Sequence, residues 1–483
     1  MSKIIFVALL FFYVCNISAN IKVAQIFSDN MVLQADKPIV VWGMADVAES
    51  VTIQINNISA KTRAGVDGKW SLELSPMSYG GPYNLYAFGD DTVCVKNIMI
   101  GEVWLCAGQS NMRMTVRGAY NADNEISNAN YDNIRFFNIP QEGAAVPADD
   151  VDAIWEVCSS NTVARQTAAG YYFGRELLKE LKVAIGLIDI SYGGANLVTF
   201  IDNNTIVQSQ YENQINTLEE VIVSGLKEEI IKWENNDKVG NRPPFYPQII
   251  PSFCYNAMVN PIVPYTLRGI VWYQGESDVD RPGKYIDWFG LYLNTMRKKF
   301  QDPELPACFV QLAGFENQYN TNFKPEVWAQ FRLAQEKCLK YPNTGMITAC
   351  DIGMKDDIHP KNKQEVGRRL SLYALNQVYD KTEIISQGPG IKSFEKEGDC
   401  VIITFNNCAN GLKSTSKCNL VPGFWGIHEN GNIVELKGKI IAANKVEVKI
   451  GKVMILRYAY ANYPVCSLYN MAGLPALPFQ IDL

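Results

Sequence analysis

Histidine is scarce in this sequence, and its cysteines are not paired at short spacing. The 483 residues include only two histidines, His359 and His428, and no two of the 12 cysteines form a CxxC pair. Structural zinc sites draw on four Cys or His ligands, usually at short spacing, so we expect no metal site. A reaction that needs a histidine base has only these two residues to choose from.

Charge is neither abundant nor clustered. Charged residues make up 19% of the chain, and the net charge is −6. Nucleic-acid-binding proteins show clusters of Lys and Arg. The one basic spot, Arg297-Lys298-Lys299, suits the polar end of a helix. We therefore expect no nucleic-acid partner.

Long hydrophobic runs are also missing, since a membrane span needs about 20 apolar residues. The longest run, Ile4 to Cys15, follows Lys3 and precedes the small residues Ser18 and Ala19, which is typical of a secretory signal peptide. We expect residues 1–19 to be cleaved and the mature chain to have no membrane span. The protein would be exported to the periplasm, cell surface or medium, or to the lysosome in a eukaryote.

The chain is too long for a single hydrophobic core, because cores stop growing at roughly 250–300 residues, so we expect two or three domains. Residues 20–97 contain short strand-like runs separated by Gly, Asp and Pro turns, which predicts a β-sandwich-like N-terminal domain. Residues 98–385 alternate strand-like and helix-like patterns and predict an α/β domain with a parallel sheet. Residues 386–483 predict a β-rich C-terminal domain.

Four predicted strands of the α/β domain are followed by residues that can carry chemistry. These strands run from Ile100 to Ala107, Ala184 to Ile190, Gly269 to Tyr273 and Met346 to Thr348. Ligands of open α/β sheets bind beyond the carboxyl ends of the strands. The residues that follow the four strands are therefore the candidates for a site.

The first candidate is Ser110, in Gly108-Gln109-Ser110-Asn111-Met112. A serine between a strand and a helix is placed for nucleophilic attack, and its own N–H can stabilise an oxyanion. Serine is equally a favoured helix N-cap, and the pentapeptide alone does not separate the two roles. It is not a GxSxG elbow, because Met112 occupies the second glycine position.

The base candidate is His359, in Asp356-Asp357-Ile358-His359-Pro360. Either neighbouring carboxylate can orient the imidazole and stabilise its charged form. The alternative is an exposed acidic loop with an incidental histidine. The position after a strand of the same sheet favours His359, since His428 lies in the turn-rich β-like tail.

Donors for an oxyanion can come from the two remaining loops. Gly194 follows the second strand and can present its N–H without an obstructing side chain, and Gln274 follows the third strand with an amide. Each signal is weak alone, since Gly-Gly after a strand is usually a turn. Together the four loops supply a nucleophile, donors and a base.

The four loops around Ser110, Gly194, Gln274 and His359 are the first to fourth blocks of the site. In this order they resemble the SGNH hydrolases, and the residues around them resemble the sialate O-acetylesterase family. The matching segments span nearly the whole mature chain: Asn30–Gln34, Gly101–Trp104, Gly108–Met112, Trp272–Ser277, Asp357–Gln364, Arg457–Ala459, Asn462–Cys466 and Leu468–Asn470. The resemblance implies a three-layer α/β/α, flavodoxin-like central domain flanked by β-rich N- and C-terminal segments.

The resemblance also implies residue roles. Ser110 is the nucleophile and His359 the base, and the Ser110 N–H, the Gly194 region and Gln274 form the oxyanion hole. SGNH enzymes place the orienting acid three residues before the histidine, which favours Asp356. The sialate branch often places it two residues before, which gives Asp357, so both stay open.

The third block departs from the general Gly-x-Asn pattern, because the chain has Gln274-Gly275-Glu276 there. The side-chain donor is therefore the least defined part of the site. Gln109, Glu276 and Arg113 complete the predicted oxyanion and substrate-binding set.

The implied activity is a serine esterase that removes O-acetyl groups from sialic acids through an acyl-enzyme, with no cofactor. A sialate carboxylate favours a nearby cation, which Arg113 or Arg117 would supply, although both are equally explained as solvated helix residues. Trp104, Trp272 and Tyr273 are candidates for stacking on sugars but at strand positions more often belong to the core. The alternatives are an acetylxylan-type polysaccharide esterase and a non-catalytic glycan-binding surface protein.

Overall fold

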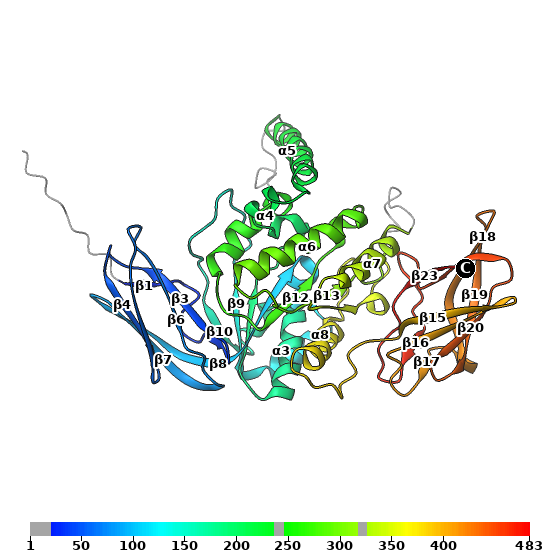
Figure 1. The fold of residues 1–483 in the computed structure, drawn as a ribbon, viewed down its shortest axis with the longest axis horizontal. Helices are drawn as coiled ribbons and strands as arrows, with labels where there is room; N and C mark the ends of the chain where they lie inside the picture. The colour runs from blue at the N-terminus through cyan, green and yellow to red at the C-terminus, as the bar shows by residue number, and fades with distance from the viewer. Residues whose placement is uncertain (1–20, 236–245, 317–325) are drawn as a thin grey trace, which may run out of the picture.

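The computed structural model describes residues 21–235, 246–316 and 326–483. The predicted signal peptide, residues 1–19, lies outside this range. Figure 1 shows a β-rich N-terminal part, a central part with helices around a sheet, and a β-rich C-terminal part arranged in chain order. No helix within the described ranges is long and apolar enough to cross a membrane.

The N-terminal part is built from short strands that bury alternate residues. In β4 (Ser50–Ile55), Val51, Ile53 and Ile55 are buried while the residues between them face outward. This period of two is the pattern of a sheet with one face on a core. The other strands are β1 (Lys22–Val23), β2 (Val32–Gln34), β3 (Ile39–Met44), β5 (Ile58–Arg63), β6 (Lys69–Leu74) and β7 (Gly80–Phe88).

Strand β8 (Thr92–Gly108) joins the N-terminal and central parts. Its first half pairs with β7 and β2, and its second half pairs with the central strands β11 (Ile185–Asp189) and β12 (Gly269–Tyr273). The boundary predicted between residues 97 and 98 therefore falls inside one continuous strand. The two parts also share a single hydrophobic cluster.

The central sheet has the strand order β10-β9-β11-β8-β12-β13-β14. All neighbours pair in parallel except β10 (Trp155–Ser159), which is antiparallel to β9 (Asn130–Asn138). The remaining strands are β13 (Ala307–Gln311) and β14 (Thr344–Thr348). The predicted α/β class of the centre is confirmed.

Helices cover both faces of this sheet (Figure 1). Trp272 and Phe309 are register partners on one face and contact α6 (Pro282–Lys299), with the Trp272 and Tyr292 rings 4.3 Å apart. On the opposite face, Tyr273 lies against Lys363 of α8 (Lys363–Gln377). The other long helices are α3 (Ala168–Leu181), α5 (Glu212–Asn235) and α7 (Val327–Lys337).

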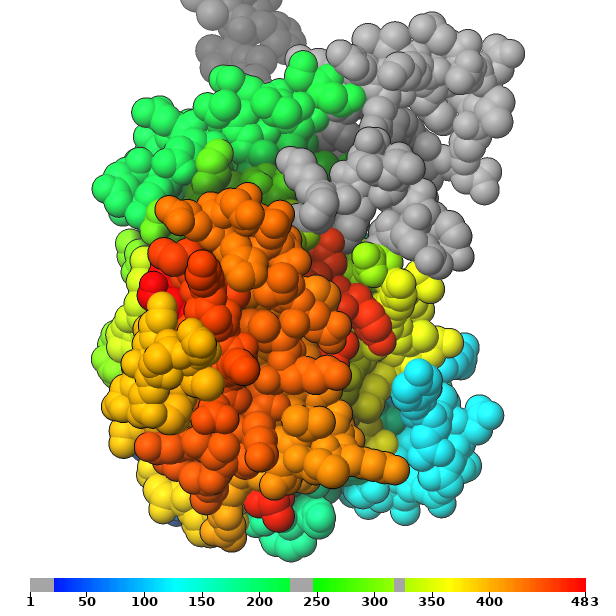
Figure 2. Space-filling view, turned by 90° about the vertical axis from the view of Figure 1, so that its right-hand side faces the viewer, coloured from blue at the N-terminus to red at the C-terminus, as the bar shows by residue number. Residues whose placement is uncertain are grey.

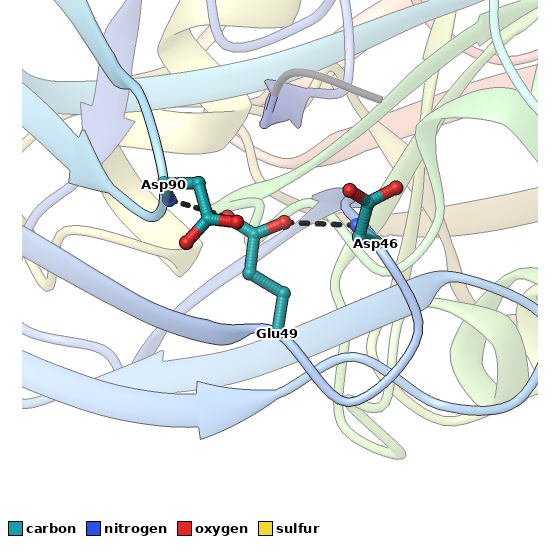
Figure 3. A group of neighbouring side chains, drawn as sticks. All are labelled: Asp46, Glu49 and Asp90. Atoms are coloured by element: carbon teal, nitrogen blue, oxygen red, sulfur yellow. Dashed lines mark hydrogen bonds between the residues drawn. The ribbon is translucent and has the colours of Figure 1, made fainter. Parts of the chain in front are cut away.

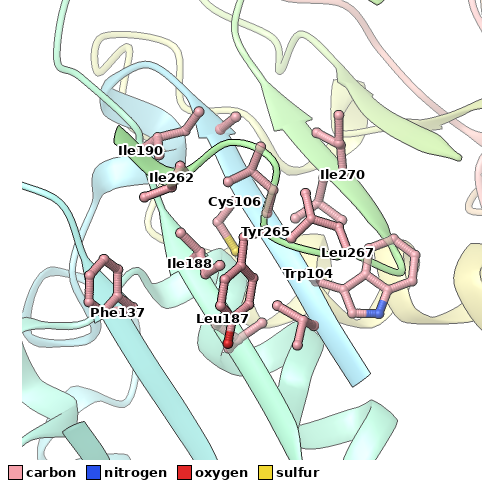
Figure 4. Packing of buried hydrophobic residues seen from close by; sticks show 14 of the residues in the cluster. Trp104, Cys106, Phe137, Leu187, Ile188, Ile190, Ile262, Tyr265, Leu267 and Ile270 are labelled. Carbon is pink, nitrogen blue, oxygen red and sulfur yellow. The ribbon is translucent and has the colours of Figure 1, made fainter. Parts of the chain in front are cut away.

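The core of the central part is formed by apolar side chains from neighbouring strands. Figure 4 shows Trp104, Cys106 and Leu187 packed among residues of adjoining strands and loops. Cys106 is fully buried, as expected for a core residue. Trp104, Trp272 and Tyr273 have no exposed surface either, so none of the three can stack on a sugar ring.

The C-terminal part has its own hydrophobic cluster and an antiparallel sheet. Figure 2 shows this orange-to-red segment covering one end of the molecule. Arg457 of this part forms an ion pair with Glu326 of the central part, with Nη1 and Oε1 2.8 Å apart. Its strands are β15 (Gly390–Glu397), β16 (Cys400–Asn406), β17 (Leu412–Ser414), β18 (Leu420–His428), β19 (Ile433–Ala442), β20 (Lys445–Lys449), β21 (Val453–Tyr458), β22 (Leu468–Asn470) and β23 (Phe479–Asp482).

Candidate active site

Ser110 begins the short helix α1 (Ser110–Arg113), two residues after the end of β8. Gly108 makes this turn with a φ of +133°, a conformation that L side chains rarely adopt. A Cβ at Gly108 would also lie only 2.1 Å from the Tyr273 carbonyl oxygen. Glycine is therefore required for the chain to leave the strand in the direction that presents Ser110.

The Ser110 hydroxyl and the His359 ring meet across the edge of the sheet. The Ser110 Oγ lies 2.8 Å from His359 Nε2, although the two residues are 249 positions apart. The His359 side chain is 43% exposed, so the pair opens to solvent. This arrangement brings the predicted nucleophile and base within proton-transfer distance.

Of the two candidate acids, the structure brings Asp357 beside the histidine. The Asp357 Oδ1 accepts the His359 backbone N–H at 2.8 Å and lies 3.8 Å from the ring Nδ1. Asp356 is exposed and makes no hydrogen bond or ion pair with the described part of the chain. The site thus contains a close Ser–His contact and a longer His–Asp contact.

The electrostatic surroundings favour the neutral form of His359. Partial burial lowers the pKa of His359 below its ordinary value, and the nearby charge of Lys363 lowers it further, while Asp357 opposes this shift. A neutral imidazole at neutral pH can accept a proton from the serine.

Two backbone N–H groups beside Ser110 are available for an oxyanion. Across the described ranges, neither the Ser110 N–H nor the Gly194 N–H donates to a protein acceptor. The loop that carries Gly194 adjoins the nucleophile, since a Cβ at Gly193 would lie 3.9 Å from the Ser110 Cβ. Ser277 Oγ donates to the Gly194 carbonyl at 3.0 Å and anchors this loop to the third block.

The side-chain N–H groups of the predicted donor Gln274 bind other acceptors. Its Nε2 donates to the Ala195 carbonyl at 3.1 Å and to Asp278 Oδ2 at 2.7 Å. An amide has two N–H hydrogens, so both are occupied within the fully buried loop. The Gln274 side chain connects the second and third blocks and does not point a free N–H at Ser110.

Like Gln274, Gln109 connects two of the loops. Its buried Oε1 accepts the backbone N–H groups of Gly275 and Ser277, both at 3.2 Å. The residue before the nucleophile therefore holds the third block against the first.

Glu276 belongs to a buried polar cluster that also contains Asn111 and Lys363. Asn111 Nδ2 donates to Glu276 Oε1, and Lys363 Nζ donates to Asn111 Oδ1 at 2.6 Å. Burial raises the pKa of Glu276 and lowers the pKa of Lys363 to about 7. Asn111 and Lys363 were not among the predicted site residues. Both stand in the matching family segments, which was the only sequence signal for them.

Arg113 is partly exposed, and its charge is paired. Its Nη1 pairs with Oδ2 of the buried Asp189 at 3.0 Å. Asp189 Oδ1 in turn accepts the Ser191 backbone N–H at 2.8 Å. Arg117, in a short 3-10 turn (Val116–Gly118), is exposed.

Among the described residues, one group of three carboxylates has the spacing of a metal site. Figure 3 shows Asp46, Glu49 and Asp90 in turns of the N-terminal part. Glu49 uses both oxygens to accept the backbone N–H groups of Asp46 at 2.9 Å and Asp90 at 2.6 Å. The group lies outside the Ser110 site, and its central carboxylate ties two turns together.

Comparison with known proteins identifies related sequences and a related structure. Residues 100–233 and 227–376 match the family described as carbohydrate esterase, sialic acid-specific acetylesterase. The chain is 28% identical to a sialate O-acetylesterase of Mus musculus, over 94% of this chain and 93% of the relative. It is 26% identical to the Homo sapiens sialate O-acetylesterase, over 94% and 91%.

The crystal structure of a carbohydrate acetylesterase from Xanthomonas citri superposes with a TM-score of 0.83. The two proteins are 26% identical, and the match covers 96% of this chain and 99% of the other. The likeness therefore extends over the β-rich ends as well as the centre.

Proposed function

Because this chain belongs to the carbohydrate esterase family of sialic acid-specific acetylesterases, we propose that it removes O-acetyl groups from sialic acids at the Ser110–His359 pair. Members of such a family are carboxylic ester hydrolases, which sets aside the alternative of a non-catalytic glycan-binding protein. The observation that carries the site assignment is the 2.8 Å separation of Ser110 Oγ and His359 Nε2.

In the acylation step, Ser110 Oγ attacks the acetyl carbonyl carbon while His359 Nε2 accepts the hydroxyl proton. Negative charge develops on the carbonyl oxygen, and the unoccupied N–H groups of Ser110 and Gly194 stabilise it. His359 then donates its proton to the leaving sugar oxygen, which leaves an acetyl group on Ser110.

In the deacylation step, His359 takes a proton from water as the water oxygen attacks the acetyl-serine. The same N–H groups stabilise the second oxyanion, and acetate leaves as Ser110 regains its proton. Asp357 stabilises the imidazolium form of His359 in both steps from 3.8 Å. Each step uses only groups of this chain, the ester and water.

A second candidate substrate is an acetylated polysaccharide such as xylan. Arg113 is paired with buried Asp189 and so does not offer an uncompensated charge to a sialate carboxylate. The similar Xanthomonas citri protein is described more broadly as a carbohydrate acetylesterase. The open Ser–His pair also suits an acetyl group on a long chain.

We further propose that the centre is an SGNH-type three-layer domain and that residues 1–19 direct export. The helices on both sheet faces and the serine at a strand exit support the first assignment. The apolar N-terminal run supports the second. N-terminal sequencing of the mature protein from its native host should begin near Asn20.

The activity and its substrate are tested by measuring acetate release. The wild-type protein should release acetate from 9-O-acetyl sialic acid, and Ser110→Ala should not. Acetylated xylan is the comparison substrate at matched acetyl concentration. Equal rates for wild type and Ser110→Ala would reject the site, and a strong preference for xylan would reject the sialate assignment in favour of the second candidate.

A further inference from the structure

A buried lysine contacts the site without taking part in either step above. Lys363, the first residue of α8, has no exposed surface. Its Nζ lies 2.6 Å from Asn111 Oδ1 and 5.0 Å from the centre of the Tyr273 ring. A buried ammonium group is costly unless its partners compensate for the lost water, so its presence beside the site needs an explanation.

Asn111 joins the loops that carry the nucleophile and the base. It directly follows Ser110, and its Nδ2 donates at 2.9 Å to the carbonyl of Ile358, which directly precedes His359. The same Nδ2 donates to Glu276 Oε1 in the third block. One amide group therefore connects three loops that are distant in sequence.

Lys363 determines which way this amide faces. An ammonium group has donors only, so it must contact the amide oxygen. The NH2 group is then directed at the Ile358 carbonyl and at Glu276, which are both acceptors. With the amide reversed, Oδ1 would face these two oxygens, and the bridge between the loops would be lost.

We propose that Lys363 is a positioning residue of the esterase, which orients Asn111 so that Ser110 Oγ and His359 Nε2 stay within hydrogen-bonding distance. This proposal rests on the function proposed above. The buried cation aligns Ser110 with His359, and these two residues carry out the bond-making steps.

The charge of Lys363 provides a readout that packing alone does not. The charged or titratable groups that face Lys363 are Glu276, Asp357, His359 and Tyr273. Lys363 lowers the pKa of His359, whereas Asp357 raises it. Lys363 is protonated below about pH 7, where the activity of a histidine base declines, so removing its charge should move that decline to higher pH.

The test uses Lys363→Met, which keeps length and removes both donor and charge, and Lys363→Gln, which keeps a donor without charge. With p-nitrophenyl acetate, Lys363→Met should lower kcat by about 10- to 100-fold, with little change in KM, because the base is misplaced but still present and general-base catalysis as a whole contributes about 10²- to 10⁴-fold. Lys363→Gln should recover part of kcat. Both variants should shift the acidic limb of the kcat/KM profile to higher pH.

A double-mutant cycle tests whether Lys363 acts through Asn111. Asn111→Ala should be slow, and Lys363→Met added to it should cause no further loss, because the two residues form one unit. Melting temperatures identify variants that fail to fold. If Lys363→Met does not fold, then Lys363→Gln and Asn111→Ala carry the same comparison.

Wild-type kcat with an unmoved acidic limb in a folded Lys363→Met or Lys363→Gln would overturn the proposal. Additive losses in the double mutant would do the same. Ser110→Ala is assayed in parallel: if it keeps the wild-type rate, the proposed function itself fails. If only the Lys363 and Asn111 results disagree with expectation, the positioning role alone is rejected.

Discussion

Replacing Asp357 by asparagine should isolate the charge that stabilises the imidazolium form of His359. The Asp357→Asn side chain keeps an oxygen that can accept the His359 backbone N–H, now made at 2.8 Å. The substitution therefore preserves the loop and removes only the negative charge at 3.8 Å from Nδ1. Asp356→Asn is the matched control, since Asp356 is exposed and has no partner in the described part of the chain.

The expected loss of kcat in Asp357→Asn depends on how exposed the side chains of His359 and Asp357 are. Two unit charges at about 4 Å interact by about 1 kcal/mol in water and about 4 kcal/mol at an effective dielectric constant of about 20. The side chains of His359 and Asp357 are 43% and 41% exposed, so the value near water applies. One kcal/mol corresponds to about a fivefold change, and we expect kcat to fall by about 5- to 10-fold.

The assay is the pH dependence of kcat/KM with p-nitrophenyl acetate. Asp357 raises the pKa of His359, so its removal should lower that pKa and move the acidic limb to lower pH. Asp356→Asn should leave rate and profile close to wild type. A larger loss with Asp356→Asn than with Asp357→Asn would refute the reasoning and restore Asp356 as the orienting acid.

Three further outcomes are expected. Ser110→Ala should reduce kcat by at least about 10³-fold while the melting temperature stays near wild type, since removing a nucleophile spares the fold. Gly108→Ala should lower the free energy of unfolding in urea by about 2–4 kcal/mol, because the φ of +133° and the Tyr273 carbonyl both oppose a Cβ; an unchanged value would contradict the turn described here. The pKa of Lys363 is about 7 in the fold and 10.5 ordinarily, so the unfolded chain binds more protons between these values and stability should rise with pH across that window. Lys363→Met should flatten this rise in urea titrations, and an identical slope in both proteins would count against the assignment.

Strands β8, β11, β12 and β14 and the positions of Ser110 and His359 followed from local pattern, whereas β9 and β10 were not predicted. Apolar runs of strand length mark β8, β11, β12 and β14, and a polar residue follows each of them within three positions. Parallel strands bring their carboxyl ends to one edge, so convergence of the four loops was predictable. The helix α3 likewise begins and ends where its apolar spacing does.

Other elements were missed. Helix α5 was not predicted, although Ile215, Leu218 and Ile222 stand at helical spacing in its sequence. The continuity of β8 across the predicted boundary at 97/98 was also hidden, because turn residues before it resemble those between domains.

The sequence by itself determined which residue types can carry an esterase reaction here: one serine and one histidine at strand exits, with glycine and amide groups nearby. Only the tertiary structure decided their partners, since it placed Asp357 rather than Asp356 at the ring, consumed the Gln274 amide, and joined Asn111 to Lys363. The reason is physical. Strand and helix patterns depend on neighbours a few residues apart, whereas a hydrogen bond between residues 252 positions apart depends on how the packed elements meet.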